Sequence, residues 1–338
     1  MVYYDLRKDE LFSWEYEWGK HFSGRTIHKK VFVARYIEKG RLGIGMSDDG
    51  EEALKLAKKC CVGKGWSIEP VSKSNRFSMK DFFDEEIVEW CETLWKDMEG
   101  LKRRVKLSYG IEKRSYEDCN GITYSKTIYY GTFSVWGLKA KPRREEGYES
   151  IYFFEKPSFE ELESVVKKVL ERIEHKMKAK PVRSGRYDVI LHPNVGSVFA
   201  HEALGHLFEA DQKKSILKNK EGKTIAPEWF SLWDNPLKKG FGFYPFDDDG
   251  CEAKQTCLVK EGKIVDYLRD RLNGGCGNGR AAIGKPILVR MSNTYIGEGD
   301  ATLEEMLEGF TGYLFLQTLG GCTHPETGEY RFSVDHGY

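Results

Sequence analysis

The feature that most constrains the fold is a pair of long β-patterned segments joined at Asn120-Gly121. Residues 102–138 read as a strand meander, and the segment after Asn120-Gly121 is rich in Ile, Thr, Tyr and Val, the residue types that favour strands. Asn-Gly between two such segments is a strong hairpin signal, because both residues accept the positive φ of a tight turn. Residues 31–47 read as two further strands around Lys39-Gly40. The first half of the chain is therefore expected to contain an antiparallel meander.

Three helices are expected beside these strands. Residues 52–61 are rich in Ala, Leu and Lys, and residues 78–99 place apolar side chains at helical spacing. Ser158 with Glu161 forms a capping-box signature at the start of a helix through about Met177. The polar stretch 141–150 is expected to be a loop. Together these patterns predict an N-terminal α/β domain over residues 1–180.

In the second half of the chain, strand and loop patterns outnumber helical ones, which predicts a mainly β domain over residues 181–338. The expected fold class of the whole chain is therefore α+β. Strands are expected at 187–192 and 287–296, and a hairpin at 257–270 turns over Glu261-Gly262. Thr302 and Glu305 form a second capping box. The long aromatic segment 212–246 is expected to be a lid or an interface.

Composition excludes several classes of protein. The 53 basic and 53 acidic side chains cancel, which argues against a protein that holds nucleic acid by long-range charge. No window approaches the ~20 apolar residues of a membrane helix, and the N-terminus lacks the apolar region of a secretory signal. We therefore expect a cytoplasmic protein. Its eight cysteines form no C-x-x-C pair and are expected to stay reduced.

The motif that carries chemistry is His201-Glu202-Ala203-Leu204-Gly205-His206. Neutral imidazoles are good zinc ligands, and a neighbouring Glu can take a proton from a metal-activated water. Zinc proteases commonly space the two histidines four residues apart, whereas here they are five apart. At ~100° per residue a regular α-helix would splay the two rings, and a π-type widening would bring them together. We therefore predict a bulge or a helix end at 204–206, which Gly205 would tolerate. The alternative is a chance motif on a half-buried helix.

The segment LHPNVGSVFAHEALGHLFEAD, residues 191–211, resembles the signature of the TldD/PmbA metalloproteases, also named as modulators of DNA gyrase. Further blocks match the family in order: FDDDG at 246–250, GNGR at 277–280, RMSNTY at 290–295 and the segment 320–332. The likeness covers most of the chain and is densest from 187 to the end.

The resemblance implies an intracellular, dimeric peptidase that acts on peptides or unfolded segments. Carried over by position, His201 and His206 would be metal ligands and Glu202 the general base. Glu209 and Asp211 would orient a metal ligand or gate the site, or else belong to a solvated helix end. Arg280 and Asn293, in matching blocks, would contact substrate or serve structural roles. Zinc is expected, because imidazole and thiolate suit it, with iron and manganese as the alternatives that ligand softness leaves open.

One departure from the family concerns the third ligand. Members continue beyond the block matching RFSVDHGY and supply a cysteine ligand, whereas this chain ends at Tyr338. Cys322 does not lie at the matching position, and Cys276 is disfavoured because it lies in a Gly-rich loop, so the C-terminal domain is expected to be truncated and the metal weakly held. An inactive partner subunit, in a homodimer or paired with a paralogue, is therefore the alternative to an active enzyme. A nucleic-acid-linked regulator is disfavoured by the neutral charge.

Overall fold

The computed structural model describes residues 2–19, 23–71 and 74–338, and the chain divides into two compact units. The first unit comprises Met1–Lys178 together with the segment Ala281–Ile287. The second unit comprises Ala179–Arg280 and Leu288–Tyr338. Both units combine helices with β-sheet, one sheet in the first unit and several in the second, so the expected α+β class is confirmed.

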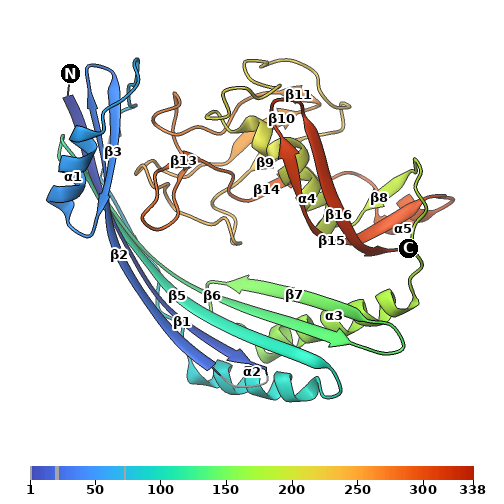
Figure 1. Cartoon of the computed structure of the whole chain (residues 1–338). Helices are drawn as coiled ribbons and strands as arrows, with labels where there is room; N and C mark the ends of the chain where they lie inside the picture. The colour runs from blue at the N-terminus through green and yellow to red at the C-terminus, as the bar shows by residue number, and fades with distance from the viewer. Residues whose placement is uncertain (1, 20–22, 72–73) are drawn as a thin grey trace. The chain divides into compact units, whose positions relative to one another are not determined.

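The first unit is built on a strongly curved seven-stranded sheet (Figure 1). Its order is β3-β2-β1-β5-β6-β4, with β7 also pairing β6. All pairs are antiparallel except β4 with β6, so the narrower expectation of an α/β domain is wrong. The β5–β6 hairpin turns at Asn120-Gly121 as expected, with Gly121 at φ 76°. The strands are β1 (Val2–Trp18), β2 (Ser23–Glu38), β3 (Arg41–Ser47), β4 (Asn75–Ser78), β5 (Lys102–Asp118), β6 (Thr123–Lys139) and β7 (Glu145–Phe153).

Three helices cover one face of this sheet: α1 (Gly50–Lys59), α2 (Glu85–Asp97) and α3 (Phe159–Lys178). The α2 and α3 helices bury Leu94 and Val169 against Phe133 and Val135 of β6, which form one core. The expected Ser158 capping box is present in both directions. The second helix begins seven residues later than expected, because the Asp84 side chain caps it by accepting from the Glu86 N–H.

The opposite face of the sheet buries charged side chains. Asp9 is fully buried, and Arg7 donates to both of its oxygens at 2.8 and 3.0 Å. The segment Ala281–Ile287 completes the cluster, because Arg7 donates to the Lys285 carbonyl and Gly284 N–H donates to Asp9. Buried charges of this kind are tolerated only when paired.

Several strands were not expected from the sequence, among them β7 and β1. The segment expected to be a loop at 141–150 contains most of β7, which pairs with β6 along its length. The N-terminal strand β1 was not expected, because its buried positions carry charges such as Asp5, Arg7 and Asp9 in place of apolar residues. Tertiary pairing overrides weak strand propensity at both sites.

The second unit consists of short strands, irregular segments and a helical stretch that carries the histidine motif. The predicted hairpin over Glu261-Gly262 is confirmed, as is the capping box of Thr302 with Glu305. The strand expected at 287–296 is divided between two sheets. The elements are β8 (Val189–Leu191), α4 (Pro193–Phe199), a π-helical turn η1 (Ala200–Leu204), a 3₁₀ turn η2 (Gly205–Phe208), β9 (Leu232–Asp234), β10 (Thr256–Lys260), β11 (Lys263–Ile264), β12 (Gly279–Arg280), β13 (Leu288–Val289), β14 (Thr294–Ile296), α5 (Leu303–Leu307), β15 (Tyr313–His324) and β16 (Glu329–Gly337).

A disulfide joins Cys251 to Cys276, with the two Cα atoms 5.7 Å apart. The expectation of uniformly reduced cysteines is therefore wrong for this pair. The two residues are 25 positions apart in the sequence, so no local spacing pattern predicted the disulfide. Because the sulfur of Cys276 is bonded to Cys251, it is not available as a metal ligand.

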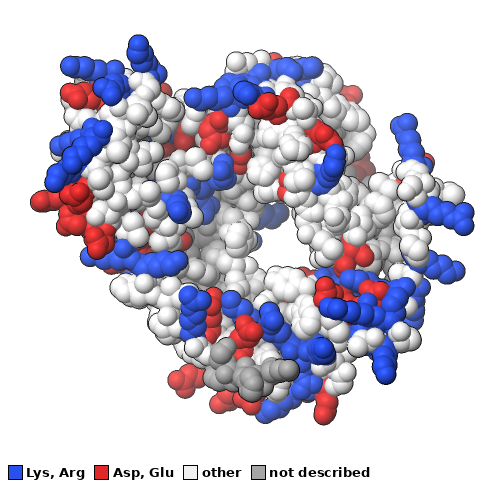
Figure 2. Space-filling model, in the orientation of Figure 1, with Lys and Arg blue, Asp and Glu red and all other residues white. Residues whose placement is uncertain are grey.

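Within the described residues, no helix combines the length and the apolar character needed to cross a membrane. On the face shown in Figure 2, Lys and Arg side chains are interspersed with Asp and Glu. This distribution agrees with the equal numbers of acidic and basic residues in the sequence.

The buried Arg7–Asp9 pair yields a test of the first unit. Asp9→Asn leaves the Arg7 charge buried beside a neutral amide, so the free energy of unfolding should fall by about 3–5 kcal/mol. The control is Glu10→Gln on the adjacent, partly exposed pair with Lys8, which should change it by less than about 1 kcal/mol. Urea unfolding followed by fluorescence measures both, and equal small losses would contradict the buried pairing.

Candidate metal centre

The histidine motif lies where one helical stretch changes its winding twice. Helix α4 passes directly into the π-helical turn η1, and η1 passes into the 3₁₀ turn η2 at Gly205. The Gly205 N–H donates to the Ala200 carbonyl, five residues back, and also to the His201 carbonyl. The predicted distortion at 204–206 is confirmed, in the wide form that a five-residue histidine spacing requires.

This winding brings His201, Glu202 and His206 together. One donor atom from each of the three side chains lies within 4.8 Å of the other two. The imidazole centroids are 4.6 Å apart and the ring planes meet at 81°. Two nitrogens bound to one tetrahedral zinc are separated by about 3.4 Å, so a modest inward adjustment would place the donors at ligand distance. The donor set thus fits a divalent metal ion.

Two glycines leave room for the cluster. A Cβ on Gly205 would lie 2.0 Å from the Met291 sulfur, so any larger residue there would displace the turn or Met291. A Cβ on Gly321 of β15 would lie 2.8 Å from Glu202 Cγ. The π-helical turn and strand β15 therefore pack so closely that the Glu202 side chain lies against the backbone of Gly321.

Glu209 fixes the orientation of the second imidazole. Its carboxylate Oε2 lies 3.2 Å from His206 Nδ1, and the side chain is 1% exposed. Because a carboxylate accepts, Nδ1 donates this hydrogen bond, and the lone pair of Nε2 is left for a metal. The same hydrogen bond raises the pKa of His206, and burial opposes the shift. Glu209 thus contacts His206 directly, and its role in orienting a metal ligand stays a prediction.

His201 experiences the opposite shift. Partial burial of the ring lowers its pKa, and the neighbouring His206 adds to the effect. The carboxylates of Glu202, Glu209 and Asp234, in that order, counteract the shift in the pKa of His201 electrostatically, and Asp234 of β9 was not among the predicted site residues. This fully buried carboxylate accepts hydrogen bonds from Ser292 and Thr294, which hold β9 against β14. A neutral imidazole is the form that binds metal.

Asp211 does not contact either histidine. It accepts a hydrogen bond from the Val289 N–H, and burial raises its pKa. Arg290 lies between the two acidic residues, 3.5 Å from Glu209 and 3.9 Å from Asp211. Arg290 was not predicted as a site residue, although its block RMSNTY had been noted.

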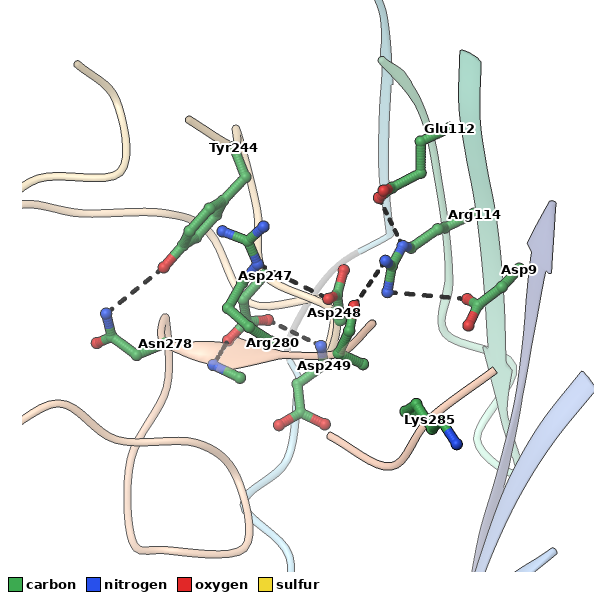
Figure 3. A network of polar contacts seen from close by, with 12 residues as sticks. Asp9, Glu112, Arg114, Tyr244, Asp247, Asp248, Asp249, Asn278, Arg280 and Lys285 are labelled. Carbon is green, nitrogen blue, oxygen red and sulfur yellow. Dashed lines mark hydrogen bonds and ion pairs between the residues drawn. The ribbon is translucent and has the colours of Figure 1, made fainter. Parts of the chain in front are cut away.

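The two predicted substrate-binding residues have structural partners. Arg280 lies over the Tyr244 ring at 4.2 Å and 3.8 Å from Asp248, within the network of Figure 3. In the same network Asp247 accepts hydrogen bonds from four backbone N–H groups. Asn293 accepts from the Gly242 N–H and donates to two carbonyls of the 235–238 segment. Both side chains therefore stabilise loops, and a role in substrate binding stays a prediction.

The comparisons with known proteins agree with the geometry of the site. Residues 184–338 match the family described as the PmbA/TldA metallopeptidase C-terminal domain. A metalloprotease of Archaeoglobus fulgidus is 31% identical over 371 residues, which cover 100% of this chain and 85% of that protein. A zinc metalloprotease TldD homologue of Saccharolobus solfataricus is 32% identical over 191 residues, which cover 53% of this chain and 42% of that relative.

Solved structures share the fold at low sequence identity. A Thermotoga maritima protein named as a modulator of a DNA gyrase superposes with a TM-score of 0.79 at 16% identity, over 94% of this chain and 79% of its own. TldE of Thermococcus kodakarensis gives a TM-score of 0.72 at 17% identity, over 98% of this chain and 83% of its own. These likenesses support the fold alone.

The close approach at Gly205 generates a prediction. Gly205→Ala should destabilise the protein by about 1–3 kcal/mol, because the new methyl group overlaps the Met291 sulfur. Gly196→Ala in α4 is the control: its Cβ would meet nothing closer than 4.0 Å, so stability should stay or rise. Met291→Ala should partly rescue Gly205→Ala in thermal unfolding, and strict additivity of the two losses would contradict the packing.

The Glu209–His206 hydrogen bond generates a second prediction. Glu209→Gln weakens the support of the imidazole, so zinc affinity measured by competition with a chelator should fall by about 10–100-fold. Glu228→Gln removes the same charge from an exposed position of the second unit and should leave the affinity unchanged. Equal affinities in the two variants would show that Glu209 does not act on the metal ligand.

Proposed function

The chain belongs to the TldD/PmbA metalloprotease family, and on this premise we propose that it hydrolyses peptides with a divalent metal held by His201 and His206. Zinc is the proposed ion, in line with the name of the Saccharolobus solfataricus relative. The observation that carries the proposal is the convergence of three donor atoms within 4.8 Å at the π-helical turn.

The side chains divide the chemistry between them. A bound divalent cation would polarise the scissile carbonyl and make a water molecule more acidic. Glu202 would accept the proton of the attacking water and return it to the leaving amine, because its carboxylate lies beside both imidazoles. Glu209 would keep His206 in the tautomer that exposes Nε2, through the 3.2 Å hydrogen bond.

The proposed substrate is an extended peptide or an unfolded segment. Strand β16 is an edge of the three-stranded sheet β16-β15-β8 and packs against the π-helical turn. A peptide added along this edge would gain backbone hydrogen bonds with little dependence on its sequence. The retained Glu202 favours an active subunit over an inactive partner, and we propose a dimer with a second copy or a paralogue.

Metal removal and one isosteric substitution test the proposal. Treatment with a chelator should abolish cleavage of a quenched fluorescent peptide, and added zinc should restore it. Glu202→Gln should lower kcat by about 10²–10⁴-fold while zinc remains bound, because only the proton acceptor is lost. His206→Ala should bind zinc much more weakly and lose the cleavage, because one of the proposed ligands is removed.

His324→Ala is the control for the histidine substitution, since His324 lies at the start of the β15–β16 turn outside the cluster. It should retain zinc and activity. Cleavage that survives Glu202→Gln at the original rate would contradict the assigned role of Glu202. Zinc binding without cleavage in the unaltered protein would favour the inactive partner.

A further inference from the structure

The Cys251–Cys276 disulfide holds a glycine-rich loop of the second unit. This loop, residues 273–280, has four glycines among its eight residues. Gly274 and Gly277 adopt φ values of 71° and 107°, which glycine reaches without strain. A chain so rich in glycine has many conformations when it is not held, so its ordering is costly in entropy. The covalent link to Cys251 lowers that cost.

Asn278 connects this loop to the rest of the second unit. It lies two residues after Cys276, and its side chain is buried. The side-chain amide donates to the Asp234 carboxylate at 3.2 Å, and the carbonyl accepts from the Arg290 N–H at 3.0 Å. The position of Asn278, and with it the contacts to Asp234 and Arg290, therefore depends on the order of the loop.

Both partners of Asn278 act on the histidine cluster. Asp234 acts electrostatically on His201. Arg290 lies 3.5 Å from Glu209, whose carboxylate is 3.2 Å from His206 Nδ1. The disulfide-linked loop is thus connected to each of the two imidazoles through residues that contact or influence them.

From these connections we propose that the Cys251–Cys276 disulfide is a redox modification site, at which a dithiol reductant loosens the loop and lowers the affinity of the metal centre for zinc. The inference rests on the metal site of the proposed function. Loss of a supporting partner typically costs a metal site 10–100-fold in affinity. Reduction only loosens the support, so the affinity should fall by about three- to tenfold.

Cys276 offers the sulfur that a reductant can reach. It is half-buried, whereas Cys251 is 4% exposed. A thiolate of the dithiol attacks Cys276 Sγ to form a mixed disulfide, and Cys251 leaves as a thiolate and is protonated. The second thiol of the dithiol then displaces Cys276, which becomes a thiol. Two electrons and two protons pass from the dithiol, which ends as a disulfide, to the cysteine pair.

The buried Asp247 holds the same two segments together in a second way. Its carboxylate accepts from the Cys251 N–H at 2.8 Å and from the N–H groups of Gly277 and Gly279 at 2.9 and 3.0 Å. Figure 3 shows Asp247 in the same network as Asn278. These hydrogen bonds do not require the disulfide, so reduction should loosen the loop and leave the unit folded.

Zinc titration of the full chain in two redox states tests the proposal. Thiol counting under denaturing conditions should find six free cysteines in the oxidised protein and eight after treatment with dithiothreitol, which is removed before the titration. Competition with a chromophoric chelator should show the three- to tenfold weaker affinity in the reduced form. Eight thiols before treatment, or the same titration curve in both states, would overturn the proposal.

A variant without the two thiols excludes zinc binding by the reduced cysteines themselves. Cys251→Ser combined with Cys276→Ser should have the affinity of the reduced protein and should not respond to the dithiol. Cys60→Ser removes a free, exposed cysteine, so this control should keep the full difference between the redox states. A double variant that binds zinc as tightly as the oxidised protein would contradict the role of the disulfide.

Hydrogen exchange follows the connection without any metal. In the zinc-free protein, reduction should speed the exchange of the Arg290 N–H by about tenfold or more, because its acceptor is the Asn278 carbonyl. The Val265 N–H, which donates to the Leu258 carbonyl in the same unit, is the control and should exchange at an unchanged rate. An Arg290 N–H that is equally protected in both states would also overturn the proposal.

The outcomes separate this inference from the proposed function. If zinc affinity depends on the redox state while the protein cleaves no peptide, the proposed peptidase fails and the redox site stands. If the protein cleaves peptides with zinc and both redox states bind the ion equally, the redox site fails and the peptidase stands.

Discussion

The hydrogen bond from the Gly205 N–H to the Ala200 carbonyl is the constraint on which the candidate metal centre depends. A regular α-helix would rotate His206 by about 140° from His201 and separate their nitrogens. The π-helical turn removes much of that rotation. The 3₁₀ turn that follows ends the wide hydrogen-bonding pattern after Leu204. The requirement for Gly205 follows from the same geometry, since Met291 occupies the space of a side chain.

The second unit supports this turn with polar contacts from distant parts of the chain. Glu209 holds His206, Arg290 lies against Glu209, and Asp234 links the neighbouring strands through Ser292 and Thr294. Such supporting shells keep metal ligands oriented before the ion arrives. One residue, Glu209, both contacts His206 and lies on the wall of a cavity.

The sequence alone was sufficient for features encoded within a few residues. The histidine spacing with Gly205 predicted the widened turn, and Ser158, Thr302 and Asn120-Gly121 marked helix starts and a hairpin. Contacts between distant residues could not be predicted in this way. The Cys251–Cys276 disulfide, the approach of Gly321 to Glu202 and the position of Asp234 arise only when loops and strands assemble. Strand β1 was missed for a related reason. The charged side chains of Arg7 and Asp9 can be buried on one face of the strand only because they pair with each other, and this pairing is not visible in a hydrophobic pattern.

X-ray absorption at the zinc edge tests the central claim most directly. In the zinc-loaded protein we predict two imidazole nitrogens at about 2.0–2.1 Å from the metal. One imidazole contribution should disappear in His201→Ala, and likewise in His206→Ala. A zinc environment that is the same in both variants as in the unaltered protein would contradict the convergence of these two side chains on one ion.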